Sequence, residues 1–220
     1  EQLDALVMES TYGDREHGDI CYADDDLAEI INQTIAQGGK ALIPSFALER
    51  TQEVIFHLVR LVREERMPEV PIYIDSPMAS AVTRIFARSP RYMDDEFIDL
   101  RETGRVFEAD FVHFISSVPE SKELTASKKP CIVISASGMC EHGWILHHLK
   151  SCIGDSRSTI LIVGYQAENT LGRRLVEGAE EVRIFGDFFE RKANVRVLNA
   201  FSAHADRLDL LEYTRAVKPK

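Results

Sequence analysis

Residues 41–62 of the 220-residue chain read ALIPSFALERTQEVIFHLVRLV, a short apolar run followed by a longer mixed segment. The run Ala41-Leu42-Ile43 has the length and continuous apolar character of a strand buried on both faces of a sheet. Five apolar side chains of the second part recur at helical spacing: Val54, Ile55, Leu58, Val59 and Val62. The pattern stops at Met67-Pro68, because proline breaks a helix. The stretch therefore predicts a buried strand that leads into an amphipathic helix.

Similar runs occur along the whole chain. Residues 5–8, 72–74, 131–134 and 160–163 each predict a further buried strand. Helical patterns lie between them, and a last helix over residues 208–213 has Asp206 as a candidate cap. This alternation predicts an α/β fold with a mainly parallel, Rossmann-like sheet.

Two regions fit this alternation less well. Residues 89–129 carry Pro90, Gly104 and Pro119 as breaks and predict an excursion on one side of the sheet. Residues 182–199 predict an antiparallel pair at the sheet edge. The chain also starts directly in a predicted strand and stops just after a predicted helix, so we expect it to be part of a longer protein.

The composition is that of a folded protein with excess acid. Hydrophobic residues make up 45% and charged residues 28%, which excludes collagen-like, low-complexity and disordered chains. The 26 Lys and Arg against 36 Asp and Glu give a net charge of −10. This is the wrong sign for a surface that attracts nucleic acid everywhere, so we expect any phosphate contact to be local.

No apolar stretch approaches the roughly 18 residues of a membrane span, and no signal peptide is visible at the start, so no membrane partner is expected. The four cysteines contain no CxxC pair and do not resemble a disulfide framework: Cys21, Cys131, Cys140 and Cys152. We interpret them as reduced thiols of a cytoplasmic protein.

Polar and glycine-rich segments follow the predicted strands. They cover residues 9–17, 44–50, 75–78, 135–139 and 164–174. The carboxyl ends of parallel strands meet at one edge of a sheet, where binding sites are built. Hydroxyls, backbone N–H groups and arginines are the donors that hold phosphate oxygens. Repetition of these donors along one edge therefore indicates a phosphate site.

Two single residues are candidates for chemistry. Glu9 follows the first predicted strand, although by residue type alone a solvated carboxylate is the stronger interpretation. His204 precedes a capped helix, where a general acid can be positioned. His142, His147 and His148 lack the spacing of zinc ligands, and we predict partly exposed helix residues there.

Six ordered elements together resemble one family. They are ESTYGDR at 9–15, IPSFA at 43–47, DSPMA at 75–79, SASGM at 135–139, GYQ at 164–166 with Gly172, and SAHAD at 202–206. The chain resembles the β-CASP branch of the metallo-β-lactamase superfamily, which includes ribonuclease J and the endonuclease of pre-mRNA 3′-end cleavage. The resemblance covers nearly the whole chain.

The resemblance implies a domain organisation. In the family, a Rossmann-like β-CASP cassette interrupts a metallo-β-lactamase αββα domain. Residues 1–15 would be an edge of that domain, residues 16–194 the cassette, and residues 195–220 the truncated return. The HxHxDH motif for two zinc ions would precede residue 1, and a further zinc-binding histidine would follow Lys220. We therefore expect neither zinc binding nor nuclease activity from this segment alone.

The resemblance also implies site roles in the longer zinc-dependent protein. His204 would protonate the departing oxygen of an RNA phosphodiester, and Glu9 would orient His204 and raise its pKa. Substrate contacts would come from Ser202, Ser135, Ser137, Gly138, Arg50, Arg173 and Arg174. The partner would be RNA, cut with little reading of base sequence, and a homodimer is compatible with the family.

Two other functions stay open at this point. One is a non-catalytic phosphate- or nucleic-acid-binding α/β module, which the lack of a GxGxxG or Walker A sequence disfavours. The other is an inactive scaffold homologue without zinc ligands, which the pair Glu9 and His204 disfavours. Endonuclease and 5′-exonuclease activity are equally compatible with the sequence.

Overall fold

The computed structural model describes residues 3–16, 22–102, 105–202 and 204–218. Its centre is a six-stranded sheet of order β3-β2-β4-β1-β5-β8 in which every pairing is parallel. The strands are β1 Lys40–Pro44, β2 Ile72–Asp75, β3 Val112–Phe114, β4 Cys131–Ser135, β5 Thr159–Ile162 and β8 Asn194–Val197. This architecture confirms the predicted α/β fold with a parallel sheet.

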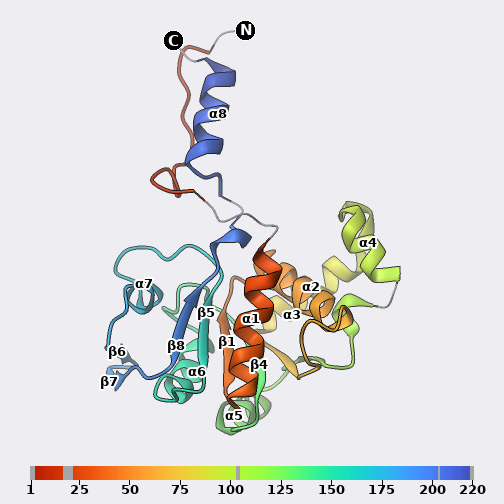
Figure 1. Cartoon of the computed structure of the whole chain (residues 1–220), viewed down its shortest axis with the longest axis vertical. Helices are drawn as coiled ribbons and strands as arrows, with labels where there is room; N and C mark the ends of the chain where they lie inside the picture. Colours follow the sequence, from red (N-terminus) through yellow and green to blue (C-terminus); the bar gives the residue numbers. More distant parts are fainter. Residues whose placement is uncertain (1–2, 17–21, 103–104, 203, 219–220) are drawn as a thin grey trace.

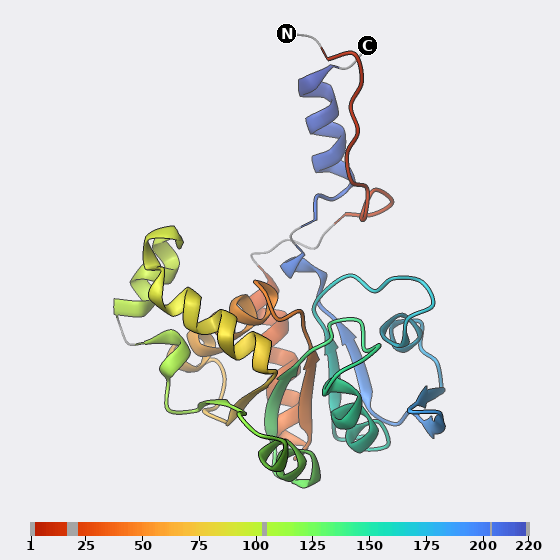
Figure 2. The ribbon, with the colours of Figure 1, turned by 180° about the vertical axis from the view of Figure 1, so that it is seen from behind.

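Helices cover both faces of the sheet. They are α1 Ala23–Ala36, α2 Arg50–Arg63, α3 Pro77–Arg88, α4 Asp95–Glu102, α5 Val118–Ala126, α6 Ile145–Cys152, α7 Leu171–Val176 and α8 Arg207–Val217. Figure 1 has α1 in front of the sheet, and Figure 2, from behind, has α5 and α6 in front. Short 3₁₀ turns occur at η2 Pro90–Tyr92, η3 Val106–Glu108 and η4 Asn199–Phe201.

Alternate side chains of each strand supply two separate cores. On β1, Ile43 packs in the core that contains α1 and α2, whereas Leu42 packs in the core that contains α6. The apolar stripe of α2 is confirmed, because Val54, Ile55 and Leu58 are fully buried. A parallel strand that is covered on both faces needs an unbroken apolar run, which explains why these strands were recognisable from sequence.

Two segments leave the sheet together and form a projection, which we call the stalk: residues 3–16 and residues 204–218, which include α8. Figures 1 and 2 show the first segment running beside α8, away from the sheet. A parallel bridge joins Tyr12 to Asp206, and Arg207 N donates to Arg15 O at 3.0 Å.

The predicted strand at residues 5–8 is wrong. This segment has no regular structure, and Val7 is 96% exposed. Its neighbour is α8, with Thr214 Oγ1 lying 3.6 Å from Met8 Sδ. A strand requires an adjacent strand to accept its backbone hydrogen bonds, and the described part of the chain places none beside residues 5–8.

The two regions that fit the alternation less well contain regular elements, and only part of each prediction is confirmed. Residues 89–129 contain α4, η3 and α5, but also β3, which pairs with β2 at the sheet edge. The antiparallel pair predicted within residues 182–199 exists as β6 Glu181–Ile184 and β7 Asp187–Glu190. It is separate from the main sheet, and β8 instead joins that sheet parallel to β5. The expected boundary at 194/195 thus falls within β8.

The cysteines that the structure describes are free thiols, as predicted. Burial raises the pKa of Cys131 to about 11 and that of Cys140 to about 12. Burial is also the main cause that raises the pKa of Cys152. Cys21 lies outside the described residues. Within the described ranges, no helix combines the length and the apolar character that crossing a membrane requires.

Candidate active site

The base of the stalk brings Glu9 and His204 together from opposite ends of the chain. Glu9 Oε1 lies 3.5 Å from His204 Nδ1, within ion-pair distance. The same oxygen accepts from Ala205 N at 3.1 Å, and Oε2 accepts from Thr11 N at 2.7 Å. Backbone groups from both stalk segments therefore fix the carboxylate beside the imidazole.

These contacts favour the charged form of Glu9. The backbone N–H of Thr11 is the main cause that lowers the pKa of Glu9 below its usual value, and the N–H of Ala205 and the charge of His204 act in the same direction. About half of each side chain is exposed, 42% for Glu9 and 50% for His204, so water screens their attraction here. The pair is formed but open to solvent.

Tyr12 lies at the same place and was not among the predicted site residues. It is only 2% exposed, and its ring packs edge-on against Tyr165 with centroids 5.7 Å apart and lies 6.2 Å from the His204 ring. Burial raises the pKa of Tyr12, while a hydrogen bond with Ser202 opposes that rise. Ser202 Oγ also accepts from His204 N at 3.2 Å. The sequence signal that could have identified Tyr12 is its position as an aromatic residue within the otherwise polar segment 9–17.

The loop after β4 holds the other predicted hydroxyls. Ser135 is 1% exposed, and its Oγ donates to Asp75 O at 2.9 Å, so that hydroxyl is engaged within the fold. Ser137 is less buried, and its Oγ accepts from Glu141 N at 3.3 Å. Gly138 is buried against the ring of Phe46. Of these three positions, Ser137 is the hydroxyl nearest to solvent.

Gln166 ties this loop to the loop after β5. Its Nε2 donates to Gly138 O at 2.9 Å and to Gly164 O at 3.1 Å, and the side chain is buried. Gly172 N donates to Met139 O at 3.1 Å, which adds a second tie from α7. We did not predict Gln166, although a polar residue between two glycine-containing motifs was a usable signal.

Gly172→Ala is expected to lower the free energy of unfolding by about 1–3 kcal/mol, because it overpacks this junction. A Cβ at Gly172 would lie 1.7 Å from Gln166 Oε1 and 3.1 Å from Met139 O. Gln166 can move aside only by breaking its two hydrogen bonds. Gly164→Ala is the matched control, because a Cβ there meets nothing within 4 Å. Denaturant unfolding of both variants checks this, and equal stabilities would contradict it.

The predicted arginines lie in different places. Arg50 is largely buried and pairs with Glu53, and its charge acts on Tyr12. Arg173 pairs with Glu177 at 2.6 Å, and its charge acts on Asp14 at the stalk base. Arg174 instead lines a hollow formed with the β6–β7 turn. The structure thus gathers Glu9, His204 and Ser202, with Arg50 and Arg173 near them, and leaves Arg174 apart.

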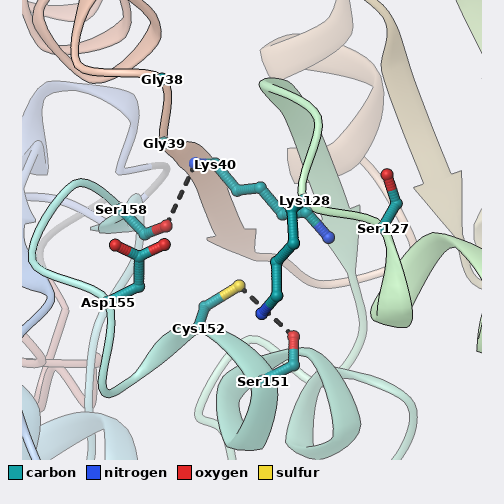
Figure 3. A pocket seen from close by; sticks show the side chains of 9 residues that line it. All are labelled: Gly38, Gly39, Lys40, Ser127, Lys128, Ser151, Cys152, Asp155 and Ser158. Atoms are coloured by element: carbon teal, nitrogen blue, oxygen red, sulfur yellow. Dashed lines mark hydrogen bonds between the residues drawn. The ribbon is translucent and has the colours of Figure 1, made fainter.

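A polar recess at the other end of the sheet is a weaker candidate. Figure 3 shows its lining, with Lys40 and Ser158 at the start of their strands. Lys40 N donates to Ser158 Oγ at 3.1 Å, and Lys40 Nζ donates to Leu124 O at 2.7 Å. Asp155 pairs with Arg157 at 2.9 Å. Because sites in α/β sheets lie at the carboxyl ends of strands, and because Lys40 and Asp155 already have partners in the fold, we interpret the recess as structural.

His148 was predicted to be a partly exposed helix residue, but its side chain is buried. Its side chain is 1% exposed, and its Nε2 lies 2.6 Å from Asp75 Oδ2, which also accepts from Ser121 Oγ at 2.6 Å. The carboxylate at the end of β2 satisfies the ring, which is why a histidine is tolerated in the interior. His142 and His147 are exposed, as predicted, but only His147 lies on a helix; His142 lies on the loop between β4 and α6.

The residues that the structure describes contain no group of three or more His, Cys, Asp or Glu side chains that could hold a metal ion. His17 and Cys21 are outside the described ranges. This chain therefore offers no described ligand set for the two zinc ions that the resemblance implies.

Comparison with known proteins supplies the context for this geometry. Residues 51–175 match the model of the Beta-Casp domain. The chain is similar to "Ribonuclease TTHA0252" of Thermus thermophilus, with 36% identity over 211 residues, which is 96% of this chain and 48% of that protein. It is 34% identical over 230 residues to an "RNase J-like protein" of Methanocaldococcus jannaschii, covering all of this chain and 51% of the relative.

A third relative carries a different name. The chain is 33% identical over 230 residues to "Transcription termination factor FttA" of Methanothermobacter thermautotrophicus, covering all of this chain and 36% of that protein. The chain thus spans about half or less of the length of these curated relatives.

Proposed function

The chain belongs to the β-CASP family of metallo-β-lactamase-fold ribonucleases, and from that premise we propose that it is the β-CASP part of a longer, zinc-dependent enzyme that hydrolyses RNA phosphodiester bonds. The observation that carries this proposal is the Glu9–His204 pair at the stalk base. The ribonuclease names of two relatives support an RNA substrate.

We place the stalk in the metallo-β-lactamase domain of that longer protein. The described residues of α8 include no buried side chain, and Leu208, Leu211 and Tyr213 are each between 44% and 56% exposed. Apolar side chains on one exposed helix are typical of an element separated from the surface that covers it. Because β8 belongs to the cassette sheet, the return to that domain lies beyond Val197, in the stretch that leads to Ser202.

His204 is the proposed proton donor to the departing oxygen. Its Nδ1 faces Glu9, so we assign the proton that reaches the substrate to Nε2. Glu9 is held by Thr11 N and Ala205 N and orients the ring. As water adds to phosphorus and releases one proton to the solvent, the bond from phosphorus to the leaving oxygen breaks, and that oxygen takes the proton from His204 Nε2.

In our proposal, the residues that bind the zinc ions lie outside this chain. The proton transfer from His204 does not involve the zinc ions. Ser202 and Ser137, with Arg173, would contact phosphate and so carry no information on base identity. The free thiols of Cys131, Cys140 and Cys152 support a reducing, cytoplasmic location.

The test compares the intact protein with the 220-residue chain on matched RNA and DNA oligonucleotides that carry different 5′ ends. We expect the intact protein to cleave RNA and a chelator to stop it, and we expect the chain alone to be inactive. Elemental analysis should then find no stoichiometric zinc in the chain. Two zinc ions per chain, or cleavage by the chain, would contradict the proposal.

The same assay separates the alternatives. An intact protein that binds RNA without cutting it would support the inactive scaffold or the binding module. Mapping of the products distinguishes internal cleavage from removal of nucleotides at the 5′ end.

A further inference from the structure

The segment of residues 76–93, which covers α3 and η2, is unusually basic for this chain. It contains three arginines and no Asp or Glu, in a protein with 36 acidic residues. Arg84, Arg88 and Arg91 are all exposed. Within the described ranges, none of the three has a carboxylate within 4.0 Å, whereas exposed Arg105 and Arg157 each pair with an acid.

Apolar and aromatic side chains are exposed on the same segment. Met78 is 68%, Ile85 is 63% and Tyr92 is 72% exposed. Met78 and Ile85 are two helical turns apart on α3, so they share a side of the helix. The Arg91 guanidinium lies 4.5 Å from the centre of the Tyr92 ring. We call these six residues the α3 face: Met78, Arg84, Ile85, Arg88, Arg91 and Tyr92.

The α3 face begins at the edge of the sheet where the binding sites of α/β folds lie. Helix α3 follows β2 directly, at the carboxyl edge of the sheet, and Figure 2 shows it uncovered on the outside of the molecule, running toward α4. Its 12 residues span about 18 Å, since an α-helix rises about 1.5 Å per residue. This length matches several nucleotides of an extended strand.

We propose that the α3 face binds single-stranded RNA in addition to the site at Glu9 and His204, and this rests on the proposed function. The arginines contact phosphates, and Tyr92 offers its ring to an unpaired base. Such binding does not depend on sequence, because every nucleotide has a phosphate and a flat base. An acidic chain thereby holds a polyanion on a segment that has no Asp or Glu of its own.

Acidic side chains lie near one of the three arginines. Arg84 lines a hollow with Glu108 and Asp110, so its attraction for phosphate is the weakest of the three. Arg88 lies in the last turn of α3, where a cation also complements the helix dipole. That role does not account for Arg84 or Arg91. A second copy of the chain would present the same arginines and repel this face, which favours a polyanion.

The test uses the intact protein, a 20-nucleotide RNA and a series of salt concentrations. The variant Arg84→Gln/Arg88→Gln/Arg91→Gln should bind more weakly and reduce the slope of log Kd against log salt by about 2, at about 0.7 per lost phosphate contact. The matched control Arg66→Gln/Arg105→Gln/Arg157→Gln removes the same charge from arginines that pair with acids. It should keep a slope near that of the parent.

Tyr92→Ala should weaken binding at least about fivefold if a base stacks on the ring. The inference would be overturned if the first triple variant kept the slope of the parent protein, or if both triple variants changed the slope equally. In these outcomes RNA cleavage remains intact, so the proposed function still stands. Loss of a dimer in the first variant alone, without loss of RNA binding, would also overturn it. An intact protein that neither binds nor cleaves RNA would defeat the proposed function itself.

Discussion

His204→Ala in the intact protein should slow RNA cleavage by about 100- to 10,000-fold, the usual contribution of a positioned general acid. RNA affinity should change little, because phosphate contacts are assigned to other side chains. The metal content should be unchanged, since His204 faces Glu9 rather than a group of ligands. Single-turnover cleavage, RNA binding and elemental analysis on the same preparation check the three statements.

The matched control is His142→Ala. His142 is exposed and lies on the loop after β4, which is neither of the two stalk segments that hold Glu9 and His204. This variant should cleave RNA like the parent protein. Loss of zinc in His204→Ala would instead make His204 a metal ligand, and equal losses of activity in the two variants would remove the special role given to His204.

Asp75→Ala should lower the free energy of unfolding by about 2–6 kcal/mol, because it leaves two buried polar groups without their partner at about 1–3 kcal/mol each. Asp75 is 2% exposed and accepts from His148 Nε2 and Ser121 Oγ, each at 2.6 Å. Its removal leaves both groups buried without that acceptor. Because domains are stable by only about 5–15 kcal/mol, this loss is a large share of the total.

Denaturant unfolding measures the effect, with Asp187→Ala as the control. Asp187 pairs with Lys150 at 3.3 Å, but its side chain is 69% exposed, so its removal should cost less than about 1 kcal/mol. If Asp75→Ala does not accumulate in folded form, Asp75→Asn keeps an acceptor and should give a smaller, measurable loss. Wild-type stability in either Asp75 variant would contradict the account.

Local patterns predicted the central elements because those elements are buried on both sides. The run at residues 41–43 became β1, and the stripe from Val54 to Leu58 became the buried face of α2. The run at residues 5–8 has the same local character and forms no strand. The difference lies in the neighbours: β1 has β4 and β5 beside it, whereas residues 5–8 lie against α8. A short stretch of sequence does not show which element will lie beside it in the fold.

Long-range polar contacts explain the other differences. The burial of His148 depends on Asp75, which is 73 positions away in the chain, so spacing within 142–148 indicated an exposed residue. The ring contact of Tyr12 with Tyr165 and the hydrogen bond from Gln166 to Gly138 likewise join residues that are far apart in the chain. The closeness of Glu9 and His204 was expected from the family resemblance alone, because nothing in the intervening residues encodes their distance.

The most direct test of the account is a double-variant cycle on Glu9 and His204 in the intact protein, measured as the rate of RNA cleavage. If Glu9 acts by orienting His204, then Glu9→Gln should slow cleavage in the parent background but have little further effect once His204 is alanine. The account therefore predicts that the double variant is about as slow as His204→Ala. Losses that multiply would show that the two residues act independently and would contradict it.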